Sequence, residues 1–187
     1  MALVWVSQTK GVPSTSSTAA PHHLVAMLLV TRKEFLRALD GLRPSEAEIR
    51  IAGLNCIAWI AGHMAWQESL FWLKWGQGQA VPERLRPFAT GRRGFVPEYR
   101  QVLADWHEIA RATEPFLRGL DHERLQRHFV SEDPKVRDLR AEENAGTLLT
   151  RCIMHYWSHI GEIACIRSLL GHRAPQFVGS LEGCRYG

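Results

Sequence analysis

The chain has 187 residues, of which 22 % are charged and 45 % hydrophobic, and its formal net charge is +4. This composition is typical of one globular domain with a core of its own, and it excludes an intrinsically disordered chain. The basic residues are scattered and no apolar run approaches the roughly 20 residues that cross a bilayer, so we expect neither nucleic acid nor a membrane as a partner.

The N-terminal part of the chain divides into an arm, a helix and a connection. Residues 1–20 end in the small polar run GVPSTSSTAA and are predicted to form a flexible arm. The first helix is predicted from Pro21 to about Leu39, where Asp40 and Gly41 end it. Residues 42–53 contain the charged run SEAEIR and predict a connection with one short helical turn.

A second helix is predicted from about Leu54 to Trp75, with Asn55 as its N-cap and Gly76 as its stop. Its inner stripe is apolar apart from one histidine and consists of Cys56, Trp59, His63, Trp66, Leu70 and Leu73. Because a buried imidazole needs a polar partner, His63 is a candidate functional residue.

The next segment, residues 76–97, is rich in glycine, proline and arginine and predicts a long loop that crosses the molecule or serves a function. The third helix is predicted from about Pro97 to Leu120, with a kink or a break near Thr113 because Pro115 lies inside it. Residues 121–144 are highly charged and predict a second long connection over one end of the molecule.

The fourth helix is predicted from about Ala145 to Leu170, with Gly171 in the left-handed position that ends a helix and residues 174–187 as a tail. No strand pattern occurs. We therefore predict an all-α protein in which residues 21–173 form a four-helix bundle, up-up-down-down, with two long crossover connections.

Two histidines of the fourth helix, His155 and His159, lie four residues apart and hence on one face, where a single metal ion can reach both rings. His63 occupies the inner stripe of another helix, so all three inward histidines can converge. Three neutral imidazoles with open positions suit zinc, nickel, iron or another divalent ion. The alternative is a set of core histidines that are bonded to the backbone or to one another.

Nearby residues offer further chemistry. Glu162 can hydrogen-bond a ligand histidine, act as a general base toward a bound water or pair with an arginine, and the last two roles are favoured. Glu68 and Gln67, one turn beyond His63, have similar status, so Glu68 and Glu162 are the candidate catalytic carboxylates. Cys152 is expected to be a buried structural thiol, although it could serve as a fourth ligand.

Two motifs carry a family resemblance. The segment from Asn55 to Glu68, with its GHMAWQE, and the segment HYWSHIGEI that begins at His155 resemble the DinB-like superfamily of metal-binding four-helix bundles. The resemblance covers about residues 22–173. It implies a bundle that is usually a homodimer, in which His63, His155 and His159 hold a divalent metal ion.

The same resemblance implies an activity, because members with known activity are largely transferases and isomerases that use a low-molecular-weight thiol such as mycothiol or bacillithiol. We therefore expect a metal- and thiol-dependent enzyme with a small-molecule substrate. The alternatives are a metal-dependent hydrolase and a non-catalytic binding or stress-related bundle. The four cysteines lack CxxC spacing and three lie in apolar helical patterns, which favours a reducing, cytoplasmic location.

Overall fold

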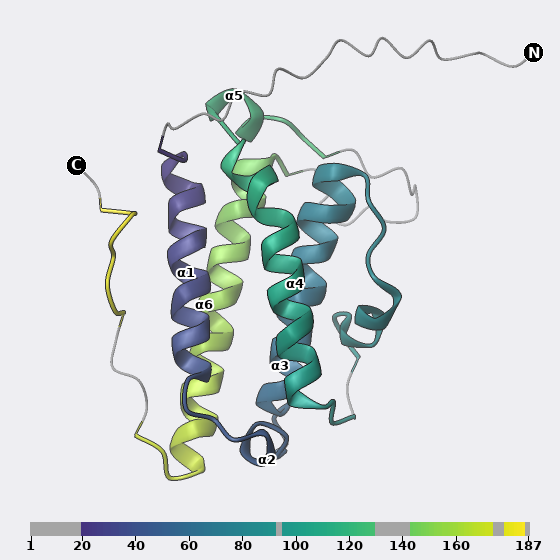
Figure 1. Ribbon diagram of the computed structural model, residues 1–187, viewed down its shortest axis with the longest axis vertical. Helices are drawn as coiled ribbons and strands as arrows, with labels where there is room; N and C mark the ends of the chain where they lie inside the picture. Colours follow the sequence, from purple (N-terminus) through teal and green to yellow (C-terminus); the bar gives the residue numbers. More distant parts are fainter. Residues whose placement is uncertain (1–19, 93–94, 130–142, 174–177, 186–187) are drawn as a thin grey trace, which may run out of the picture.

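The computed structural model describes residues 20–92, 95–129, 143–173 and 178–185. The predicted N-terminal arm therefore lies almost entirely outside the described residues. The described chain is all-helical, and four long helices lie side by side (Figure 1). The helical elements are α1 His23–Leu39, α2 Pro44–Ala47, α3 Ile57–Glu68, the π-helix η1 Ser69–Trp75, the 3-10 helix η2 Glu83–Phe88, α4 Tyr99–Arg118, α5 His122–Leu125 and α6 Ala145–Leu169.

The helix order differs from the prediction, because α1 and α6 run in one direction whereas α3 and α4 run in the other (Figure 1). At the C-terminal ends of α1 and α6, Arg167 donates hydrogen bonds to the carbonyls of Ala38 and Asp40, at 2.6 and 2.8 Å. At the C-terminal ends of α3–η1 and α4, Gly76 lies against the ring of Phe116. The bundle is therefore up-down-down-up, and the predicted up-up-down-down order is wrong.

Only one of the two predicted crossovers exists. Residues 76–92 and 95–98 run along the bundle from the end of η1 to the start of α4, whereas α4 ends and α6 begins at the same end of the bundle (Figure 1). There Asp121 caps α5 by accepting from the Arg124 amide at 2.8 Å, and the Ala145 amide bonds the Arg127 carbonyl at 2.9 Å. Length alone cannot distinguish a crossover from a connection that covers one end, because about 20 residues suffice for either.

Helix α3 is buried nearly all round, because α4, α6 and η2 cover it. It begins at Ile57, with Cys56 and not the predicted Asn55 at the N-cap position. Beyond Glu68 the helix widens into η1, whose i→i+5 bonds rotate the following side chains relative to an α-helix. Phe71 and Trp72 are consequently fully buried, while Leu70, which the regular stripe placed inward, is only partly buried.

The other long helices match their predicted positions closely. Pro115 does not break α4, which continues to Arg118, because the proline removes only one helix bond near the end and Leu117 beyond it is fully buried. Asn144 caps α6 by accepting a hydrogen bond from the Thr147 amide at 2.8 Å. Gly171 follows α6 with a φ of +81°, the left-handed conformation that was predicted for it.

The described part of the C-terminal tail lies along the outer side of α1 (Figure 1), where the Gly179 amide donates to Glu34 at 3.1 Å. None of the helices in the described segments combines the length and apolarity that crossing a bilayer requires.

Candidate metal centre

Three histidines from two helices meet in the middle of the bundle. His63 lies on α3, and His155 and His159 lie one turn apart on α6. The Nε2 atom of His155 is 3.4 Å from Nε2 of His63 and 3.1 Å from Nε2 of His159. The ligand atoms of the three residues all lie within 4.8 Å of one another, so one ion can contact all three.

The opposite ring nitrogen of each histidine faces an oxygen. Nδ1 of His63 donates to the Phe88 carbonyl at 2.8 Å, and Nδ1 of His159 donates to Oε2 of Glu162 at 2.9 Å. Nδ1 of His155 is hydrogen-bonded to Oε1 of Gln67. Because carbonyl and carboxylate oxygens only accept, these bonds place the ring proton on Nδ1 in each neutral imidazole.

This tautomer leaves a lone pair on each Nε2, and the three lone pairs point into the same space. Neutral imidazoles in this state cannot hydrogen-bond one another through Nε2, since none of the three atoms carries a proton. A cation at their centre resolves the repulsion, and a ligand histidine that donates its other ring N–H to an oxygen is the usual arrangement at protein metal sites. The donor set therefore fits a divalent metal ion.

His63 is held in its neutral form by its surroundings. Its side chain is 5 % exposed, and its ring stacks on those of Trp59 and Trp66, with centroids 5.0 and 5.7 Å away. Burial lowers the pKa of His63 to about 4, against the opposing effect of the Phe88 carbonyl. A metal ion at this site thus meets little competition from protons at His63 at neutral pH.

The carbonyl that orients His63 reaches it because Gly62 has no side chain. A Cβ atom at Gly62 would lie 2.3 Å from Cε1 of Phe88, so only glycine lets η2 approach α3 this closely. The crossing segment, predicted as an irregular loop, therefore contributes a structural part of the site through a backbone atom.

The two candidate carboxylates have different surroundings. Glu162 hydrogen-bonds His159, which is the least favoured of the three roles considered for it, and its side chain is 26 % exposed. Gln67, a further candidate one turn beyond His63, is hydrogen-bonded to the ring of His155. Cys152 is fully buried and does not belong to the histidine cluster, and burial raises the pKa of its thiol well above the usual value.

Glu68 belongs to a separate polar network in the core. Its carboxylate is paired with Arg32, whose Nε donates to Oε1 at 2.9 Å, and it also accepts from the Tyr156 hydroxyl. Arg32 and Glu68 are only 5 % and 1 % exposed. The Tyr156 hydroxyl in turn accepts from Nε1 of Trp106 at 2.8 Å. Both carboxylate oxygens of Glu68 thus have partners in the core, and Glu68 does not line the cavity beside the histidines. This arrangement favours a structural role.

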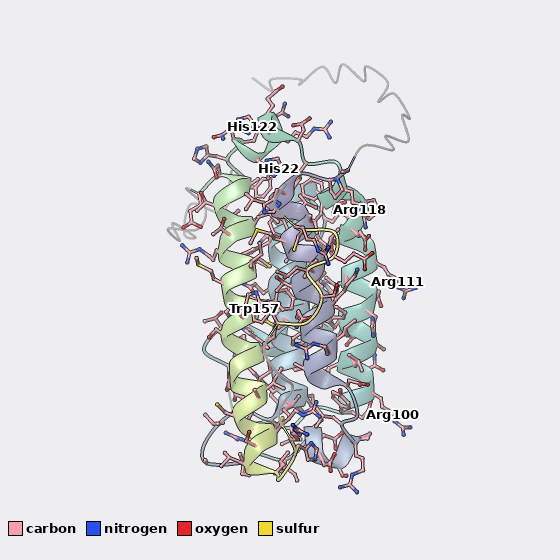
Figure 2. All side chains as sticks on the ribbon, turned by 90° about the vertical axis from the view of Figure 1, so that its left-hand side faces the viewer. His22, Arg100, Arg111, Arg118, His122 and Trp157 are labelled. Atoms are coloured by element: carbon pink, nitrogen blue, oxygen red, sulfur yellow. The ribbon has the colours of Figure 1, made fainter. Side chains whose placement is uncertain are left out.

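A cavity of about 520 Å³ leads to the histidines. It is lined by side chains of α3, α6 and the crossing segment, namely His63, Trp66, Gln67, Thr90, Thr147, Thr150, Arg151, Met154 and His155. Thr147 and Thr150 also line a second cavity of about 480 Å³, whose opposite wall includes His22 and His122 at the end of the bundle (Figure 2). Neither candidate carboxylate lines the cavity at the histidines, whereas a small molecule has room beside His63 and His155.

Several parts of the site have no clear sequence signal. The Phe88 carbonyl is a backbone group, so its residue type gives no hint of the contact. Arg151 has the sequence context of an ordinary solvated arginine on α6, so nothing in the sequence points to its place in the cavity lining.

Comparison with known families gives one match, to the family described as the DinB superfamily, over residues 27–163. The matched region begins in α1 and includes His63, His155 and His159 together with Glu162. Comparisons with curated proteins and with solved structures gave no significant match.

Proposed function

The chain belongs to the DinB superfamily, and from this premise we propose that it is a metal-dependent enzyme whose divalent ion is held by His63, His155 and His159. We further propose that it uses a low-molecular-weight thiol to attack a small electrophilic substrate, in a transfer or an isomerisation reaction. The thiol part is supported by membership of the superfamily, whose members with known activity are largely thiol-dependent enzymes.

The observation that carries the metal part is the arrangement of the six ring nitrogens. Each Nδ1 is bonded to an oxygen, and each Nε2 presents its lone pair to a common centre. Histidines that merely satisfied one another in a core would share protons between rings, so a non-catalytic bundle without metal explains this arrangement poorly.

The chain's own residues define what the site does. Gln67, Glu162 and the Phe88 carbonyl fix the ring orientations, and the cavity admits a small molecule to the open side of the cluster. A divalent ion bound there would act as a Lewis acid that favours the thiolate form of a coordinated thiol. A hydrolase that uses Glu162 or Glu68 as its base gains no support. Glu162 accepts a hydrogen bond from His159, Glu68 is paired with Arg32, and neither carboxylate lines the cavity.

The metal part is tested by elemental analysis of the purified protein and of two variants, His63→Ala and His159→Ala. We expect stoichiometric metal in the unaltered protein and loss of most of it in both variants. His107→Ala is the matched control, because His107 is an exposed histidine of α4. Unchanged metal content in both cluster variants would refute the ligand set.

The thiol part needs its own measurement. Cobalt(II)-loaded protein should develop a sulfur-to-metal charge-transfer absorption when a small thiol is added, and this absorption should be absent from the His159→Ala variant. A cobalt spectrum that thiols leave unchanged would refute thiol activation while leaving the metal centre intact.

A further inference from the structure

Among the described residues that line the cavity at the histidines, one side chain is permanently charged, that of Arg151. The other lining residues are hydroxyl, amide, aromatic or thioether side chains and the two ligand histidines His63 and His155. With a divalent ion on three neutral imidazoles, the ion and Arg151 would both carry positive charge, of which Glu143 offsets the part on Arg151. Positive charge in a concave site raises the local concentration of anionic ligands.

Arg151 stands at a defined place relative to the metal ligands. It precedes His155 by four residues on α6, so the two side chains lie on one face of the helix with Cβ atoms about 6 Å apart. Thr147, Thr150 and Met154 complete this face of the cavity. A ligand with two functional groups and a linker of matching length can therefore reach the metal with one group and Arg151 with the other.

Arg151 already holds a carboxylate. Nε donates to Oε2 of Glu143 at 2.9 Å while the NH2 group bonds Oε1, the two-pronged geometry that a guanidinium offers a planar carboxylate. The side chains are 45 % and 18 % exposed, respectively. Because the Arg151 side chain is 45 % exposed, a carboxylate from solution can reach its guanidinium and exchange with Glu143.

We infer that Arg151 is a substrate-binding residue that selects small molecules bearing a carboxylate, with Glu143 as an internal carboxylate that the substrate displaces. This inference rests on the proposed metal centre, because it places the other end of the same molecule at the ion. It assigns the substrate a chemical class, a small carboxylic acid with a second, metal-directed group.

Binding of matched hydroxamic acids to the zinc-loaded protein tests the assignment, because the hydroxamate group binds zinc without any thiol. The probes are the monohydroxamates of succinic, glutaric and adipic acids, each paired with the analogue whose free carboxylate is a carboxamide. Dissociation constants come from isothermal titration calorimetry. The three chain lengths sample different spans between the ion and Arg151.

We expect at least one acid to bind about tenfold more tightly than its amide, which is the scale of one charge-assisted hydrogen bond. Arg151→Gln should abolish this preference, and Glu143→Gln should increase it by removing the competing carboxylate. Arg118→Gln is the control, because Arg118 is also half-exposed and paired with a glutamate, Glu114, but lies on α4, away from α6 (Figure 2).

Two results would overturn the inference: acid and amide of equal affinity at all three lengths, or a preference that survives in Arg151→Gln. Hydroxamates that fail to bind zinc-loaded protein altogether, or protein that takes up no zinc, would instead count against the metal centre itself. Metal content measured on the same samples separates the two failures.

Discussion

At the scale of single residues, the orientation of the three histidines depends on groups outside the cluster. Each imidazole is fixed by a group that accepts a hydrogen bond from its Nδ1–H, namely Gln67, Glu162 or the Phe88 carbonyl. A carboxylate in this position also raises the basicity of its histidine, which strengthens the bond to a metal. Of the three acceptors, Glu162 is therefore the one whose charge contributes to affinity.

Replacing Glu162 should weaken metal binding without removing a ligand. We expect Glu162→Ala to raise the dissociation constant of the metal about 10- to 100-fold, and Glu162→Gln to raise it less, because the amide oxygen still accepts from His159. Competition with a chromophoric chelator measures both. Glu114→Ala is the control, since Glu114 pairs with Arg118 on the surface of α4. Equal affinity in all of these proteins would show that Glu162 has no such role.

The sequence predicts the histidine cluster because helical periodicity and side-chain chemistry agree at those positions. His63, His155 and His159 fall on inward stripes, and inward histidines demand a partner. The contact from Phe88 could not be predicted, because it joins a backbone atom to a ring 25 positions away. The role of Glu68 was equally hidden, since its partner Arg32 lies on α1 and only the folded bundle brings the two together.

At the scale of elements, η2 and α3 act as one unit because Gly62 lets them touch. Gly62→Ala should force the Phe88 ring away and disturb the carbonyl that orients His63. We expect a loss of about 1–3 kcal/mol in the free energy of unfolding, measured by urea denaturation, together with weaker metal binding.

Gly161→Ala is the matched control for this change. Gly161 also lies inside a helix that carries ligands, but a Cβ atom there meets nothing within 4 Å. Alanine should therefore stabilise α6 by up to about 1 kcal/mol, because it restricts the unfolded chain and favours the helix. Similar effects of the two substitutions would contradict the steric explanation.

The buried pair Arg32–Glu68 ties α1 to α3, and the Tyr156 hydroxyl adds α6 to the same network. Glu68→Gln leaves the Arg32 guanidinium buried without its counter-charge, which should cost about 3–5 kcal/mol of unfolding free energy. Glu83→Gln, which breaks an exposed pair with Arg86, should cost less than about 1 kcal/mol. A Glu68→Gln variant that loses this stability but, when folded, binds its full complement of metal would confirm a structural role. A variant as stable as the unaltered protein would refute it.

At the scale of the whole molecule, helix lengths and positions followed from the sequence but helix directions did not. Periodicity and caps are local, so α1, α4 and α6 were predicted closely. Helix direction depends on contacts between helices that are far apart in the sequence. An example is Arg167 of α6, which donates hydrogen bonds to the carbonyls of Ala38 and Asp40 at the end of α1. The widening of α3 into η1 was also missed, because the stripe that places Leu70 inward assumes regular α-helical periodicity as far as Trp75.

The metal-free protein should lose stability in mild acid because of His63. Its pKa is lowered from 6.5 to about 4 by burial, so between these values the unfolded chain binds more protons at this residue than the folded chain does. This contribution to stability is complete above about pH 6.5 and falls as the pH decreases toward 4. Urea denaturation of metal-free protein across this range measures it, and His63→Ala should show a shallower pH dependence.

The long separation of the ligands along the chain has a consequence for biosynthesis. His63 and His155 are 92 positions apart, and α6 is the last of the long helices. A chain synthesised from its N-terminus presents α3 well before α6 leaves the ribosome. Until then the nascent protein has one of the three clustered histidines, and α6 does not yet cover the apolar surface of α3. The proposed metal centre can therefore form only late in maturation, after α6 has packed against α3.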